Sequence, residues 1–321
     1  LSQENGIELR NTQDYFDLRL EVAILTAYGT IESAVEAMKK GAYSYITKPF
    51  NHRELLLQIK NGIEKARLSK EVIRLRGIVR ERYEFKNIIG ESEGMRKVLE
   101  LVTHAAETDS NVYIYGESGT GKELIAKALH LASSRKEGPF VAINCAAIPE
   151  SLLEAELFGF RKGAFTGAVH TKKGLFTQAH GGSVLLDEIS EMPFSMQSKL
   201  LRVLEEREFY PLGSEKPSKV DVRIIATSNK DLEKEIEEGR FRRDLFYRIH
   251  VIPVKLPPLR KKKGDIPLLA DHFLREMSDK TGKDIRGFSS AALQKMMLYS
   301  WPGNVRELQN VVECAVAMCT K

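Results

Sequence analysis

One seven-residue stretch constrains the fold of this chain more than any other. It reads Gly116-Glu117-Ser118-Gly119-Thr120-Gly121-Lys122. The stretch fits the pattern G-x-x-x-x-G-K, in which glycines let the backbone curl so that successive N–H groups face a phosphate and the lysine adds a mobile cation. The motif requires a strand before it and a helix after it, because the positive N-terminus of the helix adds to phosphate binding.

Both neighbours of this P-loop have the required patterns. Residues 111–115 are a short run of β-formers, and residues 123–130 carry apolar side chains at helical spacing. We therefore predict an α/β fold that binds a nucleotide through residues 116–123. Glu123 stands where a Ser or Thr normally supplies a hydroxyl to Mg²⁺, so Thr120 or water would have to substitute for it.

Composition sets the broad class of the protein. The 321 residues are 42% hydrophobic and 29% charged, which is typical of a soluble globular protein with two or three domains. No apolar run approaches the roughly 20 residues of a membrane span, and a net charge of +5 is too mild to indicate a nucleic-acid partner. The three cysteines form no C-x-x-C pair, so we expect a cytoplasmic protein with no membrane partner.

Residues 1–62 alternate strand and helix signals, with strands predicted at 22–26 and 43–49 and helices at 30–40 and 55–63. The motifs around Thr26, Tyr45 and Lys48 resemble the second half of a response-regulator receiver domain, a flavodoxin-like fold that accepts a phosphoryl group from a sensor histidine kinase. The resemblance implies Thr26 as the switch hydroxyl, Tyr45 as the switch aromatic and Lys48 as the phosphate-pairing lysine. By the same register, residues 1–6 follow the third strand of that domain, so the phosphoacceptor aspartate would lie just before residue 1.

Residues 63–86 are charged and helical, and we interpret them as a linker. Leu68, Val72, Leu75 and Val79 form a short a/d seam. Such a seam indicates either a dimerising coiled coil between domains or a helix that packs against its own domain.

Residues 87–256 continue the α/β pattern, with further strands predicted at 139–144, 183–188, 220–227 and 249–254 and helices between them, including 196–206. Strands that alternate with helices indicate a parallel sheet with both faces covered. Residues 257–321 carry only helix signals, at 266–278, 289–298 and 305–318, and we predict a small helical subdomain. We interpret its basic run, residues 260–263, as a solvated turn rather than a DNA-binding patch.

A second nucleotide signal follows the apolar run at 183–186. There Asp187 and Glu188 come at the predicted carboxyl end of a strand, where open α/β sheets bind ligands. We expect Asp187 to hold Mg²⁺, directly or through water, and Glu188 to polarise the attacking water.

Together these motifs resemble the AAA+ ATPases, in which a P-loop sheet is followed by a helical lid subdomain. The resemblance implies ATP as the nucleotide, Asn229 as the sensor that positions the water and Arg306 as the lid sensor of nucleotide state. It also implies Arg242 and Arg248 as arginine fingers, which would reach a phosphate in a neighbouring subunit and so require a head-to-tail ring.

Between the two nucleotide motifs lies the hexapeptide Gly163-Ala164-Phe165-Thr166-Gly167-Ala168. Its glycines suit an exposed loop whose tip is one aromatic and one hydroxyl, which is a poor core element and a good contact point. The hexapeptide resembles the surface loop of the bacterial enhancer-binding proteins, the NtrC-like activators of sigma-54 RNA polymerase. In that family Phe165 and Thr166 would touch the sigma factor, and ATP hydrolysis would move the loop to remodel the closed promoter complex.

This resemblance covers essentially the whole chain and implies three further properties. Asn144 would restrain Glu188 until the nucleotide state changes, receiver phosphorylation would control the ATPase, and the chain would assemble as a dimer and as an active hexamer or heptamer ring. Two features depart from the family. Arg161 replaces a Glu, so a salt bridge in the loop would be lost or repartnered, and the helix-turn-helix that binds enhancer DNA has no counterpart here, so we expect no specific DNA binding by these residues alone.

Two other functions stay open on the sequence alone. Another AAA+ remodelling ATPase would share both nucleotide motifs but not the 163–168 loop. A signalling scaffold without ATPase activity would be consistent with Glu123, although Lys122, Asp187, Glu188 and Arg248 are all intact.

Overall fold

The computed structural model describes residues 22–83 and 88–319. The chain divides into two compact units between Glu81 and Arg82, and each is described by itself. The loop at residues 1–6, which bears on the phosphoacceptor, lies outside the described residues.

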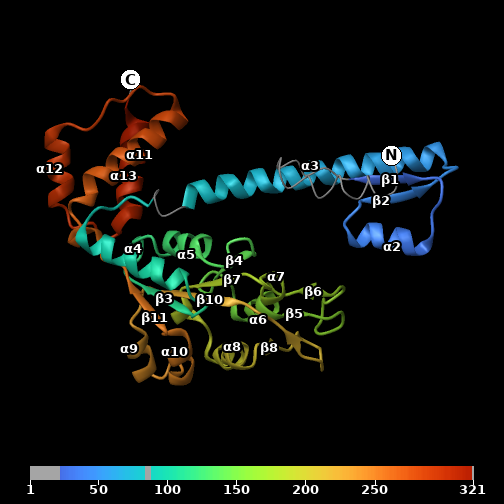
Figure 1. Ribbon diagram of the computed structural model, residues 1–321. Helices are drawn as coiled ribbons and strands as arrows, with labels where there is room; N and C mark the ends of the chain where they lie inside the picture. The colour runs from blue at the N-terminus through green and yellow to red at the C-terminus, as the bar shows by residue number, and fades with distance from the viewer. Residues whose placement is uncertain (1–21, 84–87, 320–321) are drawn as a thin grey trace. The chain divides into compact units, whose positions relative to one another are not determined.

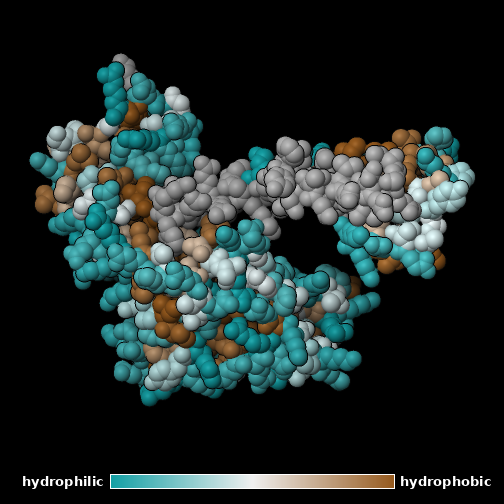
Figure 2. Space-filling view, viewed as in Figure 1, coloured by the Kyte–Doolittle hydropathy of each residue, from teal (hydrophilic) through white to brown (hydrophobic). Residues whose placement is uncertain are grey.

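The first unit is a small parallel α/β segment. It contains β1 (Ala23–Thr26), α2 (Ile31–Lys39), β2 (Ser44–Thr47) and α3 (His52–Tyr83), and β1 and β2 pair in parallel. Thr30 begins α2 through a reciprocal capping box with Ser33. Both helices expose hydrophobic side chains (Figure 2), namely Ile31, Val35, Met38, Leu56, Leu57, Ile59 and Ile63.

Helix α3 is one continuous helix of 32 residues. It joins the predicted helix at 55–63 to the predicted helical linker at 63–86, and the division between the two compact units lies within that linker. No proline interrupts the run, and Gly62 lies where the Tyr43 ring packs, since a Cβ there would come 3.2 Å from Tyr43 Cε1. In the predicted seam Leu68 is exposed, and the side chains of the other three residues lie outside those described.

The second unit is built on a five-stranded parallel sheet, as predicted. Its strand order is β11-β3-β10-β7-β4, with bounds Val112–Tyr115 for β3, Phe140–Asn144 for β4, Ser183–Asp187 for β7, Arg223–Ser228 for β10 and Ile252–Lys255 for β11. The strand predicted at 249–254 begins later because α10 (Arg243–Ile249) extends to its first residue.

Helices cover both faces of this sheet (Figure 1). Leu185 and Ile225 pack toward α4 (Glu93–Ala106) and α5 (Lys122–Ala132). The alternate residues Val184, Leu186 and Ile224 pack toward the opposite layer, formed by α6 (Glu150–Phe158), α8 (Phe194–Glu206) and α10. Because successive side chains of a strand point to opposite faces, apolar residues at every position are what a doubly covered sheet requires.

Short elements complete this body, and several of them contribute core residues, including Phe176, Ile189 and Leu232. They are β5 (Gly159–Phe160), β6 (Lys172–Lys173), α7 (Leu175–Gln178), η3 (Ile189–Glu191), β8 (Glu208–Phe209), β9 (Ser218–Lys219) and α9 (Leu232–Glu237). The strands β5 and β6 form one hairpin and β8 and β9 another. The two hairpins meet where Phe160 bridges to Leu212.

The predicted helical subdomain is present and has its own core. It contains η4 (Leu259–Lys261), α11 (Asp265–Thr281), α12 (Ser290–Leu298) and α13 (Asn304–Met318), packed around residues that include Phe273, Trp301 and Leu308. Asp265 is fully buried and accepts hydrogen bonds from the N–H groups of Glu91 and Ser92, each at 2.8 Å, so the subdomain is fastened to the start of the α/β body. Across the described residues, no helix is both long enough and apolar enough to span a membrane.

Candidate nucleotide-binding site

The P-loop has the predicted strand–loop–helix geometry. It leaves β3 at Tyr115 and enters α5 at Lys122, with Gly119 and Gly121 at φ values of 75° and 98° that favour glycine. Within the described part of the chain, the backbone N–H groups of Ser118, Gly119, Gly121 and Lys122 have no hydrogen-bond acceptor. A concave row of free N–H groups at a helix N-terminus fits a polyphosphate.

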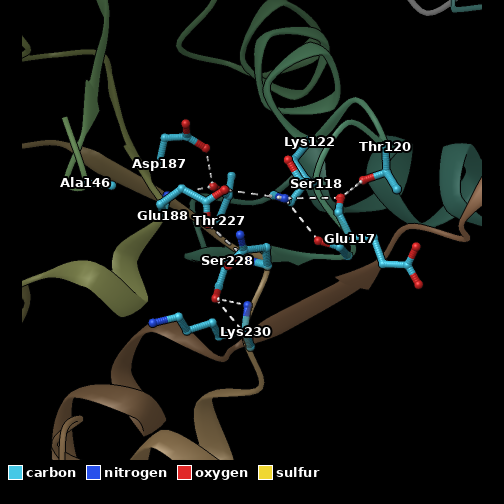
Figure 3. Close-up of polar contacts among 12 residues, drawn as sticks. Glu117, Ser118, Thr120, Lys122, Ala146, Asp187, Glu188, Thr227, Ser228 and Lys230 are labelled. Carbon is cyan, nitrogen blue, oxygen red and sulfur yellow. Dashed lines mark hydrogen bonds and ion pairs between the residues drawn. The ribbon is translucent and has the colours of Figure 1, made fainter. Parts of the chain in front are cut away.

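Lys122 is buried at the floor of this loop and is 7% exposed. Its Nζ donates to the carbonyl oxygens of Gly116 at 3.0 Å and Glu117 at 3.4 Å, and it lies 3.8 Å from Glu188 Oε1 (Figure 3). Burial lowers the pKa of Lys122, and the carboxylates of Glu188 and Asp187 oppose that shift. The cation is therefore already desolvated and faces the two predicted catalytic acids.

Asp187 ends β7 and is held on both sides by neighbouring strands. Asn144 Nδ2 donates to Asp187 Oδ2 at 2.8 Å, and Thr227 Oγ1 donates to Asp187 Oδ1 at 2.5 Å. Each carboxylate oxygen accepts one bond from these neighbours and has a second lone pair. Asp187 is thus oriented as a ligand for a cation at the carboxyl edge of the sheet.

Glu188 has a left-handed backbone at φ 52°, which is uncommon for a residue with a side chain. Its N–H donates to Thr227 Oγ1 at 3.2 Å, and its Oε2 accepts from the backbone N–H of Asn229 at 3.2 Å. Strained backbone of this kind persists where the surroundings determine it and is common at functional sites. Glu188 and Asn229 therefore lie together, joined through the main chain of Asn229.

Asn144 is placed differently from what the resemblance implied. Its amide binds Asp187, its Cα partner in the strand register, and its Oδ1 accepts from the N–H groups of Ala146 and Ala147. The implied contact with Glu188 is not formed in this structure, because the parallel register sets Asn144 opposite Asp187. Thr227, which the sequence reasoning missed, contacts both acids. The sequence feature that could have identified Thr227 is a hydroxyl side chain near the end of the mainly apolar strand β10.

Few side chains at this site could bind Mg²⁺ directly. Glu123 forms an ion pair with Lys127 at 2.8 Å on the helix surface, so it does not replace the missing hydroxyl. Thr120 Oγ1 donates to the Glu117 carbonyl at 2.8 Å and keeps lone pairs for a cation or water. No group of three His, Cys, Asp or Glu side chains within residues 22–83 and 88–319 could hold a metal by itself. Asp187 fits Mg²⁺ only together with phosphate or water oxygens.

The helical subdomain contacts the back of the P-loop. Arg306 Nη1 lies 3.4 Å from Ser118 Oγ, which places the implied lid sensor beside the loop. The basic run at 260–263 is not the solvated turn that we predicted. Arg260 forms a two-bond pair with Glu117 at 2.7 and 2.5 Å, and Lys262 is buried. Arg260 holds the pKa of Glu117 down at about 2, with a further contribution from Asn304.

The two implied finger arginines lie on the surface, at the start and in the last turn of α10. Arg242 pairs with Asp244 at 2.7 Å, and Arg248 pairs with Glu205 at 2.9 Å. Gln197, which is fully buried, accepts the Arg242 N–H at 2.8 Å and so fixes the backbone there. None of these partners belongs to the P-loop, so the structure does not bring either arginine to the site of its own subunit.

The hexapeptide forms the exposed loop that the sequence predicted. Gly163 and Gly167 have φ values of 84° and 99°, and the Gly163 N–H donates to the Ala168 carbonyl at 2.9 Å to close the turn. Thr166 is exposed, and Phe165 is 44% exposed while its ring packs on Phe160 at 5.0 Å. The aromatic at the tip is thus presented to the surface on a second aromatic.

The departure at Arg161 is accommodated by a new partner. Arg161 Nε donates to Ser214 Oγ at 3.2 Å, in the loop of the β8–β9 hairpin. A hydrogen bond from a charged guanidinium to a neutral hydroxyl therefore links the two hairpins where the resemblance implied a salt bridge.

Two of the three receiver residues, Thr26 and Lys48, lie at the carboxyl ends of β1 and β2, and Tyr45 lies earlier in β2, opposite Ile24. Thr26 pairs with Thr47 in the strand register, and Lys48 follows directly. Thr26 Oγ1 donates to the Tyr28 carbonyl at 2.9 Å, and Tyr45 shares a hydrogen bond of 2.8 Å with Ser33. This is one edge of a parallel sheet, so the topology brings Thr26 and Lys48 together.

Comparison with known protein families identifies two domains in the second unit. Residues 88–255 match the model of the sigma-54 interaction domain, and residues 260–321 match the AAA+ ATPase lid domain. Regulatory protein AtoC of Escherichia coli (strain K12) is 46% identical over 318 residues, which are 99% of this chain and 69% of AtoC. Transcriptional regulatory protein ZraR of Klebsiella oxytoca is 43% identical over 320 residues, which are 100% of this chain and 71% of ZraR.

Solved structures give the same result. The crystal structure of NtrX from Brucella abortus superimposes with a TM-score of 0.74 at 37% identity, covering 98% of this chain and 68% of NtrX. A crystal structure of NtrX in complex with ATP has a TM-score of 0.73 at 38% identity, covering 97% of this chain and 66% of that one.

Proposed function

We propose a mechanism for this chain, which belongs to the sigma-54-dependent transcriptional activators of the response-regulator type. In this proposal, ATP hydrolysis moves the 163–168 loop against sigma-54 RNA polymerase. The chain is an AAA+ ATPase with a sigma-54 interaction domain. The proposal adds which residues do the chemistry and how the energy reaches the partner.

The observation that carries the proposal is the convergence of Lys122, Asp187 and Glu188 at one edge of the sheet. Lys122 Nζ lies 3.8 Å from Glu188 Oε1, so both groups face the same edge of the sheet, where the γ-phosphate of ATP and an attacking water would bind. The B. abortus NtrX complex with ATP supports ATP as the ligand. Mg²⁺ held by Asp187 would neutralise phosphate charge. Glu188 would accept the proton of the water, and Lys122 would exchange its carbonyl partners for phosphate oxygens.

Assembly follows from the position of the arginines. Arg242 and Arg248 are anchored away from the P-loop of their own subunit, so we infer that they complete the site of a neighbour in a hexamer or heptamer ring. A sensor histidine kinase would phosphorylate the receiver domain. Thr26 and Lys48, which share one sheet edge, would report that change.

One binding experiment tests the coupling. The chain is mixed with sigma-54 and ADP–metal fluoride, which mimics the transition state, and complex formation is followed by gel filtration. We expect a stable complex with the unmodified chain and with Val169→Ala, since Val169 is exposed beside the loop but outside the hexapeptide. We expect no complex with Phe165→Ala. An active ATPase that forms no complex would contradict the proposal.

A further inference from the structure

We propose that Asn304 is a positioning residue for the P-loop, acting from the lid through the orientation of the loop's peptide groups. The inference rests on the proposed ATP site and concerns how its backbone N–H groups are aimed. Neither nucleotide motif contains Asn304, and its contacts reach across 186 and 187 residues of sequence to Ser118 and Glu117.

The Asn304 side chain is fully buried and its amide is fully used. Nδ2 donates to Glu117 Oε2 at 3.1 Å and to the Ser118 carbonyl at 3.0 Å, while Oδ1 accepts from the Leu259 N–H at 2.7 Å. The residue has a left-handed backbone at φ 53°, at the first position of α13. Three directed bonds to one buried amide hold it in a conformation that residues with side chains adopt rarely.

These contacts fix which way the loop's peptide groups face. In a trans peptide the C=O and the following N–H point in opposite directions. Because Asn304 draws the Ser118 carbonyl toward the lid, the Gly119 N–H points away from the lid. The Gly119 carbonyl is held in the same way by the first N–H groups of α13, from Val305 at 2.9 Å and Arg306 at 3.3 Å. The lid thus binds the outward carbonyls and leaves the N–H face of the loop to the phosphates.

The P-loop and the lid are closely packed where Gly119 meets Gly303. A Cβ on Gly119 would come 2.3 Å from the Gly303 carbonyl oxygen. The Glu117 carboxylate is fixed between Asn304 on one side and the two bonds from Arg260 on the other. Through these contacts the lid sets the shape of the P-loop and does more than cover it.

A reciprocal exchange of groups tests the inference on the full chain. Asn304→Asp keeps an acceptor for the Leu259 N–H but loses both donors and puts a carboxylate beside Glu117. We expect the dissociation constant for a fluorescent ATP analogue to rise about tenfold or more. In the double variant Glu117→Gln/Asn304→Asp the new amide can donate to the new carboxylate, but no group donates to the Ser118 carbonyl, so we expect affinity to stay about tenfold below that of the unmodified chain.

Controls separate positioning from folding. Asn310→Asp changes the same residue type on the exposed side of α13, and we expect it to bind like the unmodified chain. Fluorescence of Trp301, the single tryptophan, reports whether the lid core is intact in each variant. If Asn304→Asp does not fold, Arg260→Gln frees Glu117 from a half-exposed partner, and affinity should fall about threefold.

Three results would count against the inference. They are affinity within about twofold of the unmodified chain for a folded Asn304→Asp, full recovery of affinity in the double variant, or unchanged affinity in Arg260→Gln when Asn304→Asp cannot be folded. A failure of the unmodified chain itself to bind the analogue would overturn the proposed function, and this inference with it.

Discussion

Replacing Gln197 with methionine should destabilise the α/β body without changing its shape. Gln197 is fully buried on α8, and methionine has nearly the same length and volume. The amide donates to the carbonyls of Met192 at 3.0 Å and Arg240 at 2.9 Å and accepts from the Arg242 N–H at 2.8 Å. Methionine forms none of these bonds.

The expected size of the effect follows from those three bonds. A typical buried hydrogen bond contributes about 1 kcal/mol net, so losing three should lower the free energy of unfolding by about 3 kcal/mol. The Arg240 and Arg242 bonds are only partly buried, so water can replace them in part and a larger loss is not expected. The Arg242 backbone also loses its anchor, so ATP turnover should fall more than ATP affinity.

Urea denaturation followed by circular dichroism measures this change, with the slope on urea concentration checked for constancy. The control is Gln178→Met, an exposed position on α7, which should shift the free energy by no more than about 0.5 kcal/mol. A Gln197→Met variant within about 1 kcal/mol of the unmodified chain would refute the reasoning, because it would mean that the three bonds contribute little.

Three further predictions concern single side chains. Thr166→Ala should keep ATP turnover and abolish promoter opening by sigma-54 RNA polymerase, since Thr166 is exposed and belongs to neither nucleotide motif. Retained promoter opening would contradict a role of the loop in the mechanism. Glu188→Ala should bind ATP but hydrolyse it about 100-fold more slowly or worse, measured by phosphate release, and near-normal turnover would exclude Glu188 as the base. Burial lowers the pKa of His130 to about 4, below its ordinary value near 6.5, so the folded state binds fewer protons. The stability from His130 should be present above pH 6.5 and lost at about 1.4 kcal/mol per unit as the pH falls toward 4, and a His130→Gln variant with the same pH slope in urea denaturation would contradict this.

The parts of the site that could be predicted from sequence are those encoded by neighbouring residues. The glycine spacing of the P-loop, the acids after an apolar strand and the glycine-flanked hexapeptide each report local backbone geometry, and the structure forms all three. The covered parallel sheet was predictable because apolar residues occupy both faces of β7 and β10.

The contacts that could not be predicted join residues far apart in the chain. Arg260 looked like one member of a solvated basic run, but its partner Glu117 lies 143 residues away. Asn304 follows a proline and a glycine, and nothing in these neighbours reveals that its amide is buried against the P-loop. The packing of Gly62 against the Tyr43 ring, 19 residues away in the sequence, is likewise visible only in three dimensions.

The connection between the sheet and the lid limits how far the lid can travel. Strand β11 ends at Lys255 beside the P-loop strand, and η4 begins at Leu259, so the tether is the three residues 256–258, and its four Cα-to-Cα steps reach about 14 Å at full extension. Pro257 and Pro258 fix two of its φ angles and stiffen it further. The short, proline-stiffened stem therefore limits how far the lid can separate from the sheet and leaves pivoting about residues 256–258 as its least restricted motion.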